Sequence, residues 1–307
     1  MIRLFFASRL LVSSLCFFLW ATAARPVVAQ SSGPSSAPDP ASAPDPASAP
    51  APPATSAAVA QSAGDDDAAL DLAEPDFTLV NLPTTMRLPL HKGDFHLTHR
   101  FNGNLRGSTF GAEASDLFGI DEGAAISFEY RYAVLRHLEV AASRTNFNRM
   151  IQLDAKYDAI HQGGTMPVSV SGLVSVEGAN NFKEQFAPAL GAVVSREIQQ
   201  RVALYASPIW VHNSAAASGV IRDTFYVGLG GRVRVMSTTY LVAEFSPRIN
   251  GYAPGDVEYA FAIEKRVGGH VFQLNFSNSQ GTTFGQIAGG GAPLNLHLGF
   301  NLTRKFF

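Results

Sequence analysis

This chain has a single cysteine and no clear metal-binding motif. Its 307 residues include one cysteine, Cys16, which lies in the apolar N-terminal run and outside any lipoprotein-like motif. Without that run the chain has no thiol, which excludes disulfides and thiolate metal sites. The eight histidines are scattered without ligand spacing. In the densest group, His91, His96 and His99, the last two are expected on opposite faces of a strand. We therefore predict no metal and no cofactor.

Charge is also sparse, at 16% of residues. Three of the 23 basic residues precede residue 30, and eight of the 25 acidic residues lie within 30–76, so 20 basic and 17 acidic residues remain in 77–307. A domain so close to neutral lacks the positive surface with which nucleic-acid binders hold phosphates. We predict no nucleic-acid partner.

The N-terminus has the pattern of a secretory signal peptide. Arg3 and Arg9 precede an apolar run over 10–24 that is too short to span a membrane, and small residues at 27–29 precede Gln30. We predict a signal peptide over 1–29. Export of a chain that then lacks cysteine is compatible with a bacterial envelope.

A linker follows the predicted signal peptide. The sequence APDPAS occurs twice within 37–48, and alanine, proline and serine dominate 30–64. Such a composition cannot bury a core. The stretch 64–76 then holds six acidic residues and no basic one. We predict a disordered Pro/Ala/Ser-rich linker over 30–76 with an acidic end, and the sequence leaves open whether it binds a periplasmic partner.

Polar and apolar residues alternate through the rest of the chain. At the C-terminus, Leu294, Leu296, Leu298, Phe300 and Leu302 share one face, and polar residues fill most of the other. This alternation is the signature of a strand with one apolar and one polar face. Twelve candidate strands follow one another, over 94–102, 124–134, 137–145, 150–160, 167–178, 185–195, 201–211, 224–235, 239–248, 257–265, 271–277 and 294–307.

The connections between these strands favour a barrel over a sandwich. Alternate connections are short, whereas three on the other side are longer, over 104–123, 213–222 and 278–293. Short periplasmic turns and longer extracellular loops are typical of bacterial outer-membrane barrels. We predict an all-β fold over 77–307, a single-chain transmembrane antiparallel β-barrel of about twelve strands.

The C-terminal stretch is then the closing strand of the barrel. In lipid a spanning sheet must close on itself so that no backbone group is left unpaired. The terminal Phe306 and Phe307 resemble the signal that presents outer-membrane barrels to their assembly machinery, although Phe306 is the one that continues the apolar phase. We predict outer-membrane lipid and the barrel assembly machinery as partners.

Several segments of the chain resemble a known family. They are THRFNG (98–103), LFGIDEGAAISFEYRY (117–132), LEVAASRTN (138–146), LDAKYDAIHQ (153–162) and MPVSVSG (166–172). The chain looks like a bacterial outer-membrane β-barrel family of uncharacterised function. The resemblance covers most of 83–307 and implies a barrel in the outer membrane, with no substrate, catalytic residue or cofactor to transfer.

The polar faces of the predicted strands carry charges that would line a lumen. Hairpin geometry places Arg131 near Glu139, Lys156 diagonal to Glu139, Arg232 near Glu244, and Arg248 near Glu258. Such pairs stabilise a sheet, and with water between them they also line a path for small polar solutes. The candidate pore-lining residues are Glu129, Arg131, Glu139, Asp154, Lys156, Asp158, Arg232, Arg234, Glu244, Arg248, Glu258 and Glu264.

Three functions remain open at this point. The first is a passive channel, narrow or blocked by loops and by 77–90. The second is a non-conducting barrel that anchors or docks a partner. The third is an outer-membrane hydrolase built from Ser277, His297, Asn275 and Asn295, but no GxSxG or comparable motif marks a nucleophile. We predict no catalytic residue.

Overall fold

The computed structural model describes residues 72–215 and 218–307. The predicted signal peptide and most of the predicted linker lie outside the described residues. No described helix is both long enough and apolar enough to cross a membrane. The strands are β1 (Gly93–Phe101), β2 (Ala124–Leu135), β3 (Leu138–Thr145), β4 (Ile151–Ile160), β5 (Ser169–Gly178), β6 (Glu184–Ile198), β7 (Val202–Val211), β8 (Thr224–Met236), β9 (Thr239–Ser246), β10 (Arg248–Gly251), β11 (Glu258–Val267), β12 (His270–Ser277) and β13 (His297–Phe306).

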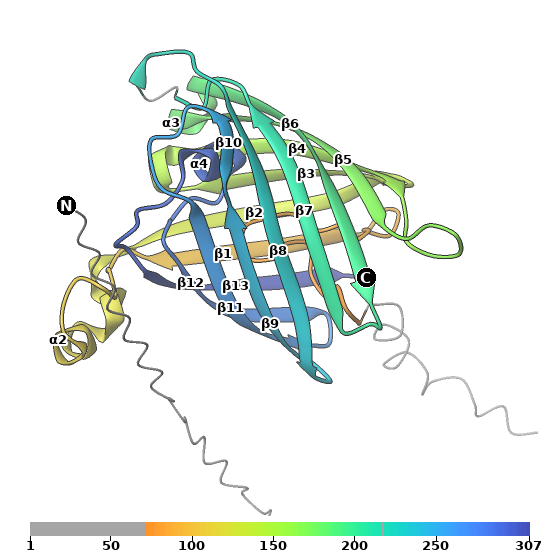
Figure 1. Cartoon of the computed structure of the whole chain (residues 1–307), viewed down its shortest axis with the longest axis horizontal. Helices are drawn as coiled ribbons and strands as arrows, with labels where there is room; N and C mark the ends of the chain where they lie inside the picture. The colour runs from red at the N-terminus through yellow and green to blue at the C-terminus, as the bar shows by residue number, and fades with distance from the viewer. Residues whose placement is uncertain (1–71, 216–217) are drawn as a thin grey trace, which may run out of the picture. The chain divides into compact units, whose positions relative to one another are not determined.

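Twelve of these strands form a closed antiparallel ring. Each strand pairs with its neighbours in sequence, β9 pairs with β8 and β11, and β13 pairs with β1. Leu97 in β1 lies opposite Leu302 in β13 and Phe128 in β2. The predicted barrel of twelve strands is therefore confirmed, and Figure 1 shows the tilted strands.

One short strand was not predicted. The expected strand 239–248 ends at Ser246, and β10 follows as a separate element that pairs with the beginning of β8. Pro247 lies between the two elements and has no backbone N–H to offer a ladder. Strand pairing is interrupted at this residue, so the expected strand ends there and β10 begins after it.

The two faces of the wall differ as a membrane barrel requires. Phe128, Tyr130 and Leu153 are exposed on the outside, whereas their neighbours Arg131 and Gln152 are buried on the inside. An apolar outer face is stable against lipid, and the polar inner groups must find partners within the barrel.

The ends of the barrel also differ. β2 and β3 are joined by two residues, as are β8 and β9 and also β11 and β12. The other end carries longer loops that contain α2 (Phe110–Ser115), η1 (Leu117–Glu122), η2 (Phe147–Arg149), α3 (Ala179–Phe182) and α4 (Phe284–Gly289). By the rule for bacterial barrels the short turns face the periplasm and the long loops face outward.

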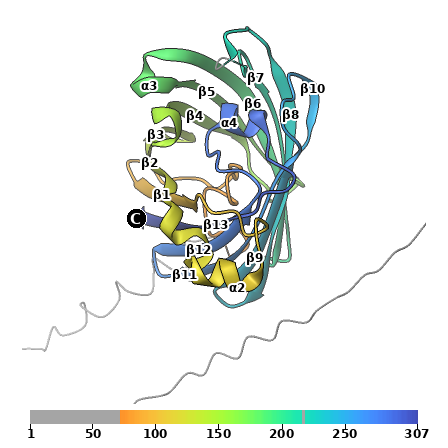
Figure 2. The ribbon, with the colours of Figure 1, turned by 90° about the vertical axis from the view of Figure 1, so that its left-hand side faces the viewer.

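A hairpin precedes β1 and occupies the lumen. We call residues 72–90 the plug hairpin. Thr78 bridges Pro83, and the N–H of Leu79 donates to the carbonyl of Leu82, so the hairpin turns at 79–82. Figure 2 shows this segment inside the ring of strands. The acidic stretch 72–76, placed in the linker by sequence, thus lies within the barrel, with Asp76 2% exposed.

The closing strand separates the two terminal aromatics. Phe306 lies opposite Gly93 of β1 and is half exposed on the outer face. Phe307 instead packs against Met86 and Leu88 of the plug hairpin. Phe306 thus continues the row of outward apolar residues, as predicted, and Phe307 contacts the plug hairpin inside the barrel.

Deletion of Phe306 and Phe307 together is expected to lower the amount of folded barrel in the outer membrane severalfold. An unclosed barrel leaves an unpaired edge, and we predict that assembly recognises the closing strand. Quantitative blotting of outer-membrane fractions measures this. Phe306→Ala should account for most of the loss and Phe307→Ala for little. Equal outer-membrane amounts of wild type and the double deletion would contradict the role assigned to these residues.

Candidate functional site

The wall residues of β2, β3 and β4 form one cluster of charges. Arg131 contacts Glu139 at 2.9 Å and Glu129 at 2.5 Å, and Nζ of Lys156 lies 3.1 Å from Glu139. The predicted closeness of Glu139 to Arg131 and to Lys156 is confirmed. Lys156 lies directly opposite Glu139 in the register, however, and not diagonal to it. Because the side chains of Arg131 and Lys156 are almost completely buried, removal of one partner would leave a charge uncompensated.

Phe77 of the plug hairpin lies among the cations of this cluster. The guanidinium of Arg131 is 5.2 Å from its ring centre, and the ammonium groups of Lys156 and Lys305 are 5.8 and 5.9 Å away. An aromatic face attracts cations, and most strongly where water is excluded. Phe77 is 1% exposed, so it anchors the hairpin to three strands at once.

A second cluster binds the backbone of the hairpin. Arg232 donates to Glu264 at 3.0 Å and to the carbonyl of Thr78 at 2.8 Å. Gln273 bonds the same carboxylate at 3.1 Å and the carbonyl of Leu79 at 2.7 Å. The predicted pair of Arg232 with Glu244 is wrong, because Glu264 and the hairpin take the guanidinium.

Glu244 holds the turn of the hairpin. Its carboxylate accepts hydrogen bonds from the backbone N–H groups of Val80, Asn81 and Leu82, at 3.0, 2.9 and 3.1 Å. Since bonds to a charged acceptor are stronger than neutral ones, three converging donors fix the turn against β9. Glu244 is 2% exposed, so water competes little with these donors.

Asn81, at the tip, links the hairpin to further wall residues. Its amide nitrogen donates to Glu258 at 2.9 Å and its oxygen accepts from Arg100 at 3.0 Å. The predicted pair of Arg248 with Glu258 is wrong, because Arg248 lies on β10 and donates to the carbonyl of Gly255, and the carboxylate of Glu258 is bound to the hairpin.

The two arms of the hairpin are held near the periplasmic end. Lys305 donates to the carbonyl of Pro75, and Thr303 donates to Asp76 at 2.8 Å. On the returning arm, Lys156 donates to the carbonyls of Thr84 and Met86, both at 2.9 Å. Other contacts join Arg87 to Asp158 at 3.5 Å and Thr85 to Ser195 at 2.5 Å.

The loop that contains α4 enters the lumen from the opposite end. The N–H of Phe284 donates to Gln152 and that of Gly285 donates to Glu177, both at 3.0 Å. Phe284 and Ile287 belong to the same buried apolar cluster as Leu79, Val80 and Leu82.

Between this loop and the hairpin lies a cavity of about 30 Å³, lined by Asn81, Arg131, Asp154, Lys156 and Phe284 among others. It has room for about two water molecules. The hairpin and α4 thus fill the lumen from both ends.

The candidate pore-lining residues fall mainly on the inner face. Ten of the twelve project into the charge clusters or line the space beside the hairpin. Of the other two, Arg234 is half-buried opposite Tyr240 near a periplasmic turn, and Arg248 lies at the loop end. The ten are Glu129, Arg131, Glu139, Asp154, Lys156, Asp158, Arg232, Glu244, Glu258 and Glu264.

Other inner-face residues were missed. Asp94, His96 and Arg100 of β1 are buried on the inner face, as is Lys305 of β13. Polar residues alternate with outward-facing residues along 94–100, and this pattern could have predicted the inner-face residues of β1. The role of Asp76 had no such signal, because the hairpin has no periodic pattern.

The residues considered for a hydrolase do not form a catalytic pair. Ser277 and His297 lie opposite each other in register. However, the hydroxyl of Ser277 donates to the carbonyl of Tyr259, and Nδ1 of His297 is hydrogen-bonded to the carbonyl of Gly103. Asn275 bonds Asn301, and Asn295 accepts from Asn104. Within 72–215 and 218–307, no group of three or more His, Cys, Asp or Glu residues is arranged to hold a metal ion.

A closed ring of twelve strands, apolar outside and polar inside, with its own N-terminal segment in the lumen, defines a plugged membrane β-barrel. The chain belongs to the family described as membrane bound beta barrel domain (DUF5777), which matches residues 76–306. It is a β-barrel of the bacterial outer membrane. A search of curated proteins found no match.

Several solved structures are similar in fold. The NanC porin is 9% identical, with 70% of this chain and 99% of the porin covered, at a TM-score of 0.45. The outer membrane protein Omp33 of Acinetobacter baumannii is 8% identical, with 70% and 98% covered, at 0.41. An outer membrane channel of Pseudomonas putida F1 is 12% identical, with 72% and 97% covered, at 0.44.

Proposed function

We propose that the protein is a gated channel for small polar solutes, closed in the present conformation by the plug hairpin. The observation that carries the proposal is how the hairpin is held. Its bridge, between Thr78 and Pro83, is internal to it, and within the described residues no barrel strand forms a ladder with it. Its departure would therefore leave every inter-strand hydrogen bond of the barrel intact.

The position of the hairpin in the chain provides an exit. It is joined to β1 through residues 91–92 at the end of the short turns, so it can leave through the periplasmic mouth. Among the contacts it leaves behind are hydrogen bonds from Arg232, Gln273 and Asn301 and to Glu244, which water can replace. The apolar contacts of Leu79, Val80 and Leu82 with the wall are lost. The opened wall would then be a charged, hydrated path.

A second candidate is a barrel that stays closed and acts as an envelope anchor or docking protein. The observation that favours it is the complete burial of the Arg232–Glu264 pair, both 0% exposed, against the hairpin. In that case the N-terminal linker would carry the periplasmic partner. Neither candidate assigns a catalytic step to any residue.

Neutralisation of the lumen arginines separates the two candidates. In planar bilayers we expect discrete openings for the full mature chain. Replacement of Arg131 and Arg232 by Gln leaves the carboxylates of Glu129 and Glu264 without their arginine partners, so the reversal potential in asymmetric salt should move toward the cation equilibrium value. Openings should also be more frequent, because Arg131 and Arg232 hold the hairpin. A folded wild-type barrel that stays silent in all recordings would overturn the channel and favour the docking role.

A further inference from the structure

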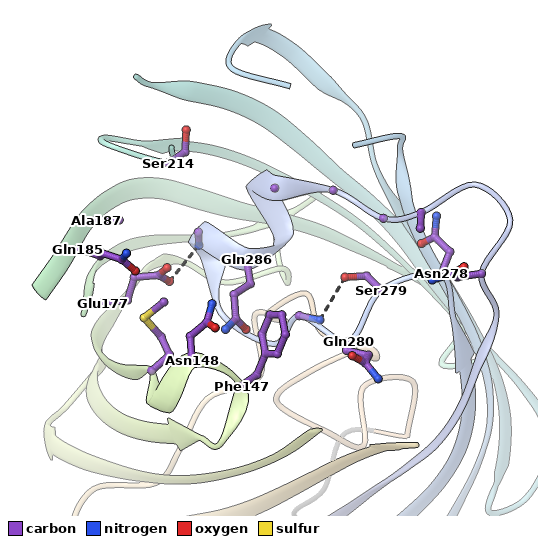
Figure 3. A pocket seen from close by; sticks show the side chains of 18 of the residues that line it. Phe147, Asn148, Glu177, Gln185, Ala187, Ser214, Asn278, Ser279, Gln280 and Gln286 are labelled. Atoms are coloured by element: carbon purple, nitrogen blue, oxygen red, sulfur yellow. Dashed lines mark hydrogen bonds between the residues drawn. The ribbon is translucent and has the colours of Figure 1, made fainter. Parts of the chain in front are cut away.

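A cavity of about 380 Å³ opens at the loop end of the barrel. We call it the vestibule. It lies between the loop that contains α4 and the outer ends of the wall (Figure 3). Its lining comes from the β3–β4, β7–β8 and β12–β13 connections and from the loop ends of β5 and β6. Its volume is within the range of small-molecule sites, roughly 300–1,000 Å³.

The lining of the vestibule combines apolar surface with polar side chains and is nearly uncharged. Amide side chains predominate, and none of the lining residues is a lysine or arginine. Glu177, its one acidic side chain, is buried and accepts from the N–H of Gly285, and His297 is bonded to the carbonyl of Gly103. The lining residues thus contribute one carboxylate and no cation.

Three amide residues reach the vestibule from left-handed backbone conformations. Their φ angles are 54° for Asn148, 55° for Gln185 and 57° for Asn213. They come from the β3–β4 connection, the beginning of β6 and the β7–β8 connection, respectively. Residues other than glycine adopt this conformation infrequently, and such positions concentrate at functional sites. Three such residues line one cavity, which indicates that the backbone conformation fixes the positions of their side chains there.

These amides have free hydrogen-bonding capacity. Within the described part of the chain, the side chains of Asn148 and Gln185 have no hydrogen-bond partner, and Nε2 of Gln286 is buried without one. Figure 3 shows Asn148, Gln286 and the ring of Phe147 gathered beside α4, with Gln185 next to Glu177. An amide offers both a donor and an acceptor.

We infer that the vestibule binds a neutral polyhydroxylated solute of the size of a mono- or disaccharide. Adjacent hydroxyls need alternating donors and acceptors, which amides supply, and the apolar C–H face of a sugar packs on an aromatic ring such as Phe147. Without a cationic side chain, the site does not favour carboxylate or phosphate ligands. That this solute is the permeant rests on the proposed function, but its binding does not.

Calorimetry on the full mature chain in lipid nanodiscs tests the site. The probes are maltose, with gluconate and glucosamine as charged counterparts at the same concentration. We expect maltose to bind and both charged probes to bind at least tenfold more weakly. Asn148→Gly with Gln185→Gly should weaken maltose binding at least tenfold, since glycine keeps the left-handed backbone without strain.

The matched control is Asn181→Gly, which removes another left-handed Asn at the same end that lies outside the vestibule and bonds Arg144. It should leave maltose binding unchanged. Absence of maltose binding, equal binding of gluconate or glucosamine, or equal losses in the control and the double variant would each overturn the inference. Maltose binding by a barrel that is silent in bilayers would support the vestibule site while contradicting the channel.

Discussion

A disulfide between positions 85 and 195 is expected to abolish the openings of the barrel, and its reduction to restore them. The hydroxyls of Thr85, on the returning arm of the plug hairpin, and Ser195, on β6, are 2.5 Å apart. Thr85→Cys with Ser195→Cys therefore brings two thiols to bonding distance with little change in volume. Because Cys16 lies in the predicted signal peptide, the exported chain has no competing thiol.

Single-channel recording before and after addition of a reductant measures the effect. The single variants Thr85→Cys and Ser195→Cys serve as controls and should open like the wild type under both conditions. Openings of full size from the oxidised double variant would show that the hairpin is not the gate. A double variant that is silent in both redox states, beside conducting single variants, would also contradict reversible gating by this segment.

The barrel was predictable from sequence because its determinants are local. Along β2 each residue faces either lipid or lumen, so Phe128 and Tyr130 alternate with Glu129 and Arg131 whatever the distant strands do. The same alternation located the pairs that Glu139 makes with Arg131 and with Lys156, since all three residues lie on neighbouring strands. The two-residue turn between β2 and β3 fixes the register of those two strands.

Only part of the plug hairpin was predictable: one alternative from the sequence had 77–90 block the lumen, but 72–76 were assigned to the linker. Residues 72–76 are acidic and follow a Pro/Ala/Ser-rich stretch, which favours a solvated tail. Asp76 and Glu74 are nevertheless buried, because the carboxylate of Asp76 accepts from Thr303, 227 residues away, and Glu74 accepts from Thr85. The hairpin is stabilised mainly by wall side chains that bind its backbone, and backbone groups leave no pattern in a sequence.

The same contacts explain why some lumen pairs were wrong. Arg232 and Glu244 lie on adjacent strands, and strand geometry alone favours their pairing. The hairpin changes the outcome, since Glu244 accepts from three backbone N–H groups and Arg232 donates to the carbonyl of Thr78. Partner choice in the lumen therefore depends on the plug.

Glu244 is the wall residue whose change should open the barrel most. Glu244→Gln keeps the size of the side chain but replaces one acceptor oxygen by an NH₂ donor, which faces the N–H groups of Val80, Asn81 and Leu82. Loss of one hydrogen bond to a charged acceptor costs about 1.5–3 kcal/mol, so the ratio of open to closed barrels should rise at least about tenfold. Open probability in single-channel recordings measures this ratio.

Glu129→Gln is the matched control for this prediction. It also removes a carboxylate charge from the inner wall, but Glu129 contacts Arg131 and has no hydrogen bond to the plug hairpin in the described structure. If release of the hairpin opens the barrel, only the change at Glu244 should raise the open probability strongly. Equal effects of the two substitutions would mean that wall charge, and not the hydrogen bonds to the hairpin turn, controls opening.

The open probability of the Glu244→Gln variant should also fall to zero when the disulfide between positions 85 and 195 is added. Persistence of openings in the cross-linked Glu244→Gln variant would place the gate elsewhere, with the loop that contains α4 as the remaining barrier in the lumen.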